Sequence, residues 1–286
     1  MKTSVSSYSF QGLINKGSET QFSVIKRAKV LGFDAIEFIT LSPHDGSDKQ
    51  TYAKLLKEEA DRNGIAISCY SVGADMLGQD KQAVIEELKA EIDVAALLGT
   101  DLVRHDIGFA FPAGTRGYQG YANCLPKFAD ICRAVTEYAA TKGIRTCTEN
   151  HGYFSQDSLR VEQLVNTVAH GNFGLLVDTG NFLCVDEDPI TAVGRCAPYA
   201  FNVHIKDFLL KSGQEGLIPQ GFFPTRGGNF LRGTVAGHGI VPLVSCVRAL
   251  KQAGYDGYLT LEFEGAEEIE FALSAGADCV KQLARS

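Results

Sequence analysis

Short apolar runs alternate with longer, polar-faced segments along this chain. The runs are rich in β-branched and aromatic residues, which is typical of buried parallel strands. The segments between them have helical periodicity, and several end at a Gly or Asn, as at Asn63-Gly64 and Leu98-Gly99. We predict strands at residues 3–10, 35–39, 65–72, 101–107, 144–149, 173–178, 200–204 and 258–262. We predict helices at residues 19–31, 48–62, 81–98, 121–141, 158–170, 189–196, 242–253 and 266–283.

Eight strands that are each followed by a helix predict an α/β fold, a single (β/α)8 TIM barrel over residues 1–286. A doubly wound open sheet is the alternative, but no GxGxxG fingerprint follows the first predicted strand. The segment at about 208–236, after the seventh strand, is rich in Gly and contains Pro219 and Pro224. It is too long for a tight connection, so we expect it to cover the site or to make a subunit contact.

Composition narrows the class of protein. With 286 residues and 45% hydrophobic content, the chain can bury a large core. The net charge of −7 argues against a nucleic-acid partner. The eight cysteines form no CxxC pair, so we expect buried free thiols in a reducing compartment. The sequence has no membrane-span-length apolar segment and no signal-peptide core at its N-terminus, which predicts a cytoplasmic protein without a membrane partner.

Metal-ligand residue types stand at the ends of four successive predicted strands. They occur in TENHG, VDTGN, VHIKD and LEFEG, as Glu149, Asp178, His204 and Glu262. A lone glutamate at a strand end is usually an ion-pair partner in a loop, but barrel geometry brings these four ends to one mouth. Their oxygen-rich set favours one divalent ion, Mn²⁺ or Mg²⁺, and leaves Co²⁺ or Zn²⁺ open. Glu264 shares strand parity with Glu262 and is its rival as the fourth ligand.

These motifs, together with IEF on the second strand and GHGIV near residue 240, resemble the xylose isomerase-like superfamily of TIM barrels, the AP endonuclease family 2 type. More narrowly, they resemble its sugar isomerase/epimerase branch, and the resemblance runs through the whole chain in order. In that branch Glu, Asp, His and Glu hold one divalent ion. The resemblance therefore implies the same metal ligands, and it implies that Glu149 and Glu262 also form the catalytic acid/base pair.

The implied reaction is physically consistent with these residues. The proton next to a sugar carbonyl is weakly acidic, so a metal that stabilises the enediolate makes its removal feasible. Glu149 and Glu262 lie on separate strands, which allows one to remove the proton and the other to return it. We therefore expect a divalent-metal-dependent sugar isomerase or epimerase, of the ketose 3-epimerase or aldose–ketose isomerase type, which works by α-proton abstraction through a metal-bound enediolate.

Departures from the relatives exclude some functions. The DNA-repair members carry a His where this chain has Asn181, and an Asp-Arg-His run where it has Leu231-Arg232-Gly233. Both the Asp and the His of that run are missing here, so a DNA-repair endonuclease is disfavoured. Many ketose epimerases also carry His at the position of Asn181, which leaves the exact sugar open.

Six further residues are candidates for substrate binding because they lie near predicted strand ends or in the motifs above. They are Glu37, His105, His151, Asn181, Lys206 and Arg232. For Glu37 and His105 the alternative is structural hydrogen bonding. Lys206 either contacts substrate or pairs with a carboxylate, and Arg232 either binds substrate hydroxyls or lies on the surface of the long segment.

Three functions compete with the isomerase. Dehydration of a keto-inositol or keto-sugar uses the same metal and the same proton abstraction, and a non-catalytic sugar-binding barrel or a DNA-repair endonuclease is less favoured. The expected partner is a small sugar or polyol, and a homo-oligomer stays open.

Overall fold

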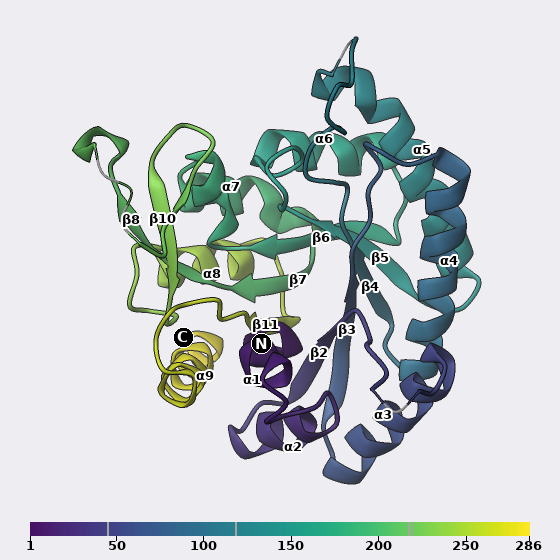
Figure 1. The fold of residues 1–286 in the computed structure, drawn as a ribbon, viewed down its shortest axis with the longest axis vertical. Coiled ribbons are helices and arrows are strands. Elements are labelled where there is room, and N and C mark those ends of the chain that lie inside the picture. The colour runs from purple at the N-terminus through teal and green to yellow at the C-terminus, as the bar shows by residue number, and fades with distance from the viewer. Residues whose placement is uncertain (45, 118, 217, 219) are drawn as a thin grey trace.

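The protein is described by a computed structural model over residues 1–44, 46–117, 119–216, 218 and 220–286. Among these residues, eight parallel strands close a barrel in the order β1-β11-β7-β6-β5-β4-β3-β2. The predicted (β/α)8 barrel is therefore confirmed (Figure 1). The barrel strands are β1 (Lys2–Ser6), β2 (Ala35–Ile39), β3 (Ala66–Val72), β4 (Leu102–His105), β5 (Arg145–Glu149), β6 (Phe173–Asp178), β7 (Ala200–Ile205) and β11 (Tyr258–Leu261).

Helices surround the barrel, as Figure 1 shows. They are α1 (Gln11–Asn15), α2 (Ser23–Val30), α3 (Lys49–Asn63), α4 (Lys81–Leu98), α5 (Tyr121–Ala140), α6 (Ser158–Val168), α7 (Pro189–Cys196), α8 (Leu243–Gln252) and α9 (Ile269–Arg285). Helix α4 shows how the sequence sets these limits. The Asp80 carboxylate accepts from the backbone N–H groups of Gln82 and Ala83 at its start, and Gly99 takes a left-handed conformation (φ 72°) at its end.

The barrel interior is apolar at its centre and polar at its rim. Alternate residues of each strand point inward, and a buried cluster fills the centre. This cluster consists of Cys69, Leu102, Cys147 and Leu176. Two positions further along β4, β5 and β6, the same inward rows reach Arg104, Glu149 and Asp178. Strand parity therefore places these polar side chains directly above the buried apolar cluster.

The first strand is shorter than predicted. Strand β1 ends at Ser6, and a 3₁₀ helix η1 (Ser7–Phe10) replaces its expected second half. The Ser6 hydroxyl accepts from the backbone N–H of Tyr8 at 3.3 Å and turns the chain. The Ser7 and Ser9 hydroxyls then accept from the backbone N–H groups of Ile39 and Phe263, both at 2.9 Å. One local and two long-range serine–backbone bonds therefore take the place of strand pairing here.

The segment predicted as a long loop contains strands. Strands β8 (Asp207–Lys211), β9 (Phe223–Pro224) and β10 (Phe230–Thr234) form an antiparallel sheet in the order β8-β10-β9. This sheet lies beside the barrel, on the side of α7 and α8 (Figure 1). The buried carboxylate of Asp207 anchors it by accepting from the backbone N–H groups of Gly237, Gly239 and Val241. The part of the predicted loop that contains Pro219 lies outside the described residues.

The remaining short elements connect these units. They are the 3₁₀ helices η2 (Asn181–Val185), η3 (Ala197–Tyr199) and η4 (Gly213–Glu215). The eight cysteines are free thiols, as expected. Within the described residues, no helix has the length and apolar character needed to cross a membrane.

Candidate metal centre and active site

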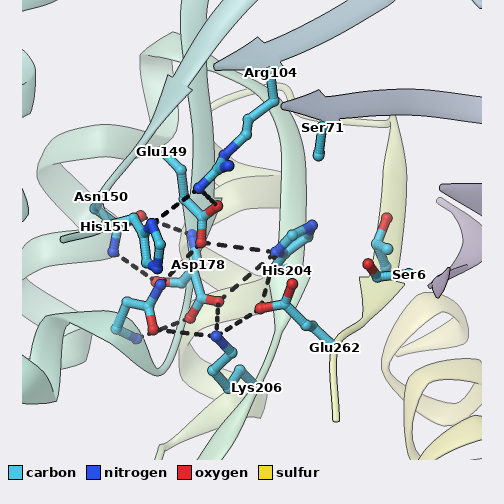
Figure 2. Close-up of polar contacts among 12 residues, drawn as sticks. Ser6, Ser71, Arg104, Glu149, Asn150, His151, Asp178, His204, Lys206 and Glu262 are labelled. Carbon is cyan, nitrogen blue, oxygen red and sulfur yellow. Dashed lines mark hydrogen bonds and ion pairs between the residues drawn. The ribbon is translucent and has the colours of Figure 1, made fainter. Parts of the chain in front are cut away.

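Four side chains from neighbouring strands converge at one end of the barrel. Glu149 ends β5, Asp178 ends β6, His204 lies in β7, and Glu262 directly follows β11. One ligand atom from each of the four lies within 4.8 Å of the others. The structure therefore brings together the four residues that the sequence nominated as metal ligands (Figure 2). Glu264 is outside this cluster of four.

The imidazole of His204 is held in one orientation from below. Its Nε2 lies 3.0 Å from Oε1 of Glu37, a carboxylate that is fully buried. Ser71 and Asn202 donate to the same carboxylate at 3.0 and 2.8 Å. Because a carboxylate accepts, Nε2 carries a proton and donates it to Glu37, and this leaves Nδ1 facing the cluster.

Glu37 therefore does not take the position that we expected from the sequence. Its side chain points into the barrel from β2, but it lies one layer below the mouth, and its oxygens accept from His204, Ser71 and Asn202. It supports a candidate ligand and does not line the cavity.

The carboxylate of Asp178 has one oxygen fixed and one open. Its Oδ1 accepts from the backbone N–H groups of Gly180 and Asn181, both at 2.8 Å. Asn150 fixes the backbone of the same residue, since its amide bonds both the N–H and the C=O of Asp178. Oδ2 is buried and makes no hydrogen bond to the described residues, and its contact with Lys206 Nζ at 3.3 Å is an ion pair without hydrogen-bond geometry.

Lys206 is the cation closest to the cluster. Its Nζ lies 2.5 Å from Oε2 of Glu262 and 3.3 Å from Oδ2 of Asp178 (Figure 2). The same atom lies 3.4 Å from Oε2 of Glu264. Burial would raise the pKa of Glu262, but Lys206 and His204 outweigh it and hold the pKa well below its usual range. Burial raises the pKa of Asp178 to about 6 despite Lys206. Of the two roles that the sequence left open for Lys206, pairing with a carboxylate describes its observed contacts.

These donors fit a divalent metal ion. Two buried atoms, Asp178 Oδ2 and His204 Nδ1, make no hydrogen bond among the described residues, and both face the centre of the cluster. Buried polar atoms are normally paired, so such orphans need an explanation. Three carboxylates and one oriented imidazole form a set that Mn²⁺, Mg²⁺, Co²⁺ or Zn²⁺ accepts.

Arg104 is a site residue that the sequence analysis missed. It is buried at the end of β4, and its Nη2 lies 2.6 Å from Oε2 of Glu149 and 2.7 Å from Oδ1 of Asp106. The same atom lies 3.1 Å from Nδ1 of His151 (Figure 2). An arginine inside an apolar strand was the available signal, because a buried arginine requires partners.

The sequence analysis predicted His105 as the site residue of this strand, but the side chain that enters the site belongs to the preceding residue, Arg104. Strand parity sends Arg104 into the barrel and His105 outward, where its ring stacks on Phe173 at 6.1 Å. His105 is fully buried between the sheet and the helices, and burial lowers its pKa to about 4. It does not reach the cavity.

A cavity of about 350 Å³ opens above the cluster. Its lining includes His151 and Lys206, two of the predicted substrate-binding residues, and also Tyr8, Arg104 and Phe109. Asn181 lies just beneath it, with its amide donating to Oε1 of Glu149 at 2.9 Å. The volume is at the lower end for ligand sites and suits a small molecule.

Arg232 lies apart from this cavity. It belongs to β10, where its Nη2 lies 3.6 Å from Oε1 of Glu267 and its guanidinium stacks over Phe222 at 5.6 Å. Arg232 is therefore not among the described residues that line this cavity.

The sequence over residues 25–283 matches a family described as xylose isomerase-like TIM barrel. The chain belongs to this family. Among curated relatives, an inosose dehydratase of Lacticaseibacillus casei is 28% identical over 165 residues. The match covers 55% of this chain and 52% of that protein, so the chain spans about half the length of the curated relatives it matches.

Solved structures show the same fold. A crystal structure of IOLI protein with a bound zinc atom superposes with a TM-score of 0.77 at 18% identity, and it covers 99% of this chain and 98% of that one. A D-psicose 3-epimerase with D-tagatose from Clostridium cellulolyticum H10 gives 0.73 at 17% identity, covering 100% and 98%. At these identities the likeness concerns the fold alone.

Proposed function

We propose that this protein is a divalent-metal-dependent sugar isomerase or epimerase that removes the proton next to the carbonyl of a small polyhydroxy ketone or aldehyde. The observation that carries the proposal is the convergence of Asp178 Oδ2 and His204 Nδ1, two buried atoms without a hydrogen bond to the described residues, with Glu149 and Glu262 beneath a sugar-sized cavity. A site built only to bind sugar would not need this buried charge.

Glu149, Asp178, His204 and Glu262 would hold the ion. When bound, the ion supplies electrostatic stabilisation of the negative charge that develops on substrate oxygens as the proton leaves. The metal is Mn²⁺ or Mg²⁺ in our proposal, with Zn²⁺ and Co²⁺ as alternatives that the same donors accept.

The proton carriers in this proposal are Glu149 and Glu262. Strands β6 and β7 separate β5 from β11 in the barrel, so the two carboxylates stand on different sides of the cluster. Glu149 is positioned by Arg104 at 2.6 Å and by the Asn181 amide at 2.9 Å. One carboxylate can take a proton from one face of a substrate carbon while the other returns it on the opposite face.

A dehydratase is the second candidate, and Lys206 favours it. Loss of a β-hydroxyl needs a base and a proton donor close together, and the Glu262 carboxylate and the Lys206 ammonium are such a pair at 2.5 Å. The inosose dehydratase relative agrees with this chemistry.

The charges around the cavity support an uncharged substrate. Four carboxylates, those of Glu149, Asp178, Glu262 and Glu264, surround Lys206, and Arg104 adds a second cation. Asp106 and Glu37 add two further buried carboxylates, so even with a divalent ion the site has no excess positive charge for a phosphate. This supports an unphosphorylated sugar or polyol.

Hydrogen–deuterium exchange tests the proposal without knowledge of the product. The protein with added Mn²⁺ is incubated in D₂O with a panel of ketoses, keto-inositols and aldoses, and proton NMR follows the α-proton signal. We expect metal-dependent loss of this signal for at least one compound. Signals of a second sugar then identify epimerisation or isomerisation, whereas a new enone absorbance identifies dehydration. Absence of exchange across the panel, or exchange that is indifferent to metal, contradicts the proposal.

A further inference from the structure

A second groove adjoins the candidate active-site cavity. It lies between the loop after β4 and the loop after β5, has a volume of about 550 Å³, and includes four aromatic side chains in its lining. Its aromatic members are Phe109, Phe111, Tyr153 and Phe154, and we call it the aromatic groove. Phe109 lines both this groove and the cavity, so the two spaces adjoin at that residue.

Two of these rings are exposed to an unusual degree. Phe109 is 55% exposed, and its ring stands edge-on against His151 with 4.9 Å between centroids. Tyr153 is 37% exposed. Large apolar side chains grouped at the mouth of a polar cavity commonly mark a binding surface.

The backbone holds the aromatic groove in place. Gly108 and Gly152 bring the two loops into contact, since a Cβ on Gly152 would lie 3.0 Å from the carbonyl oxygen of Gly108. Both adopt positive φ angles, 143° and 82°, which favour glycine. Tyr153 also has a positive φ of 62°, and its hydroxyl donates to the carbonyl of Pro224 at 2.9 Å. A non-glycine residue held in this conformation is a sign of local constraint.

The charged residues at the rim of the aromatic groove already have partners. Arg160 lies 3.2 Å from Asp157 and donates to the carbonyl of Phe154 at 2.7 Å. Arg226 pairs with the same Asp157 at 3.0 Å. The groove therefore offers ring faces and edges to a ligand, and its two arginines are held at the rim by the single carboxylate of Asp157. The exposed rings argue for an apolar, flat group in the groove.

We propose that the aromatic groove binds an aromatic ring attached to the sugar in the cavity, so that the substrate is a keto-sugar glycoside, or a similar conjugate with a flat apolar substituent, that keeps a ring carbonyl for the proton removal. This inference rests on the proposed function, because it places the sugar of that substrate above the four-residue cluster. Phe109 is the residue shared by the two spaces, and a ring next to it extends the substrate from the cavity into the groove.

Matched pairs of non-reacting glycosides test the proposal. Calorimetry compares phenyl and methyl glycosides of a panel of hexoses and pentoses, with the Mn²⁺-supplemented protein. We expect at least one phenyl glycoside to bind about tenfold or more tightly than its methyl partner, as an added aromatic contact provides. Phe109→Ala should abolish that preference and Phe109→Leu should retain part of it. Phe271→Ala, at an equally exposed phenylalanine (55%) on α9, should leave it unchanged.

The outcomes separate this inference from the proposed function. Three outcomes would contradict the proposal for the aromatic groove. They are equal affinities in every pair, no binding of any phenyl glycoside, and a phenyl preference that survives Phe109→Ala. If simple keto-sugars exchange their α-proton while the phenyl preference is absent, only the groove fails. If the phenyl preference depends on Phe109 while no compound exchanges, the groove stands and the proposed chemistry fails.

Discussion

Glu37 accepts a hydrogen bond from Nε2 of His204 at 3.0 Å, and this contact leaves Nδ1 of the same ring facing Asp178 and Glu262. Such carboxylate–histidine pairs commonly orient metal ligands, and their loss typically costs about 10–100-fold in metal affinity. We therefore expect Glu37→Gln to weaken Mn²⁺ binding by about that factor, measured by competition with a chelator. Glu187→Gln is the control, because Glu187 is a partly buried carboxylate that bonds Ser158 elsewhere. An unchanged Mn²⁺ affinity in Glu37→Gln would show that this contact does not position His204 for metal binding.

Lys206 should compete with the metal ion for its ligands. Its Nζ is 2.5 Å from Glu262 and 3.3 Å from Asp178, so an incoming cation meets a fixed positive charge. Lys206→Met removes this repulsion, and we expect Mn²⁺ affinity to rise by about tenfold or more. The melting temperature without metal should fall, because the carboxylates then repel one another. Lys81→Met, at a surface ion pair with Asp130, is the control. An affinity that falls in Lys206→Met would mean that the lysine positions the ligands.

The roles of the four ligands should separate in their metal dependence. Glu149→Gln and Glu262→Gln keep an oxygen near the ion but remove the proton carrier, so activity should fall by about 10²–10⁴-fold or more at saturating metal. His204→Ala and Asp178→Ala should act mainly through metal affinity, and excess Mn²⁺ should restore part of their activity. The measurement is activity against metal concentration for the sugar that shows exchange. Recovery of either glutamine variant to near the wild-type rate would make the glutamates ligands only.

His105 should contribute to acid sensitivity. Burial lowers its pKa from 6.5 to about 4, and its Nε2 has no partner among the described residues to support a proton. The unfolded chain binds a proton at this residue below about pH 6.5, whereas the folded protein resists it until about pH 4. The contribution of neutral His105 to the free energy of unfolding is therefore complete above about pH 6.5. As the pH falls from 6.5 to 4, this contribution decreases by roughly 3 kcal/mol.

Denaturant unfolding at several pH values tests this contribution. His105→Gln removes the titrating group, so its free energy of unfolding should fall less than that of the wild type between pH 6.5 and 4. His44→Gln, at an exposed histidine, should keep the wild-type slope. Parallel slopes for wild type and His105→Gln would show that His105 does not set the acid response.

The sequence predicted the barrel and the four candidate ligands because both follow from strand order and strand ends. The alternation of apolar runs and helices fixes the topology, and Glu149 and Asp178 directly end such runs. The sequence analysis selected His105 and not the adjacent Arg104. Successive side chains of a strand point to opposite faces, so this one-residue error selected an outward-facing residue in place of an inward-facing one. The layer depth of Glu37 depends on the stagger of neighbouring strands, which a single sequence does not reveal.

The sheet beside the barrel escaped prediction for a different reason. Strand β9 has only two residues, and β8 and β10 are joined by a Gly-rich segment with weak periodicity. Its position depends on the long-range bonds of Asp207 to the backbone of Gly237, Gly239 and Val241, and no local pattern carries that information.

The central claim is that Glu149, Asp178, His204 and Glu262 hold one divalent ion. Anomalous scattering from crystals grown with Mn²⁺ tests it most directly. We expect a single strong peak among these four side chains, at roughly 2.0–2.3 Å from their ligand atoms. A peak elsewhere, or a peak at which Glu264 replaces Glu262 as a ligand, would contradict the account.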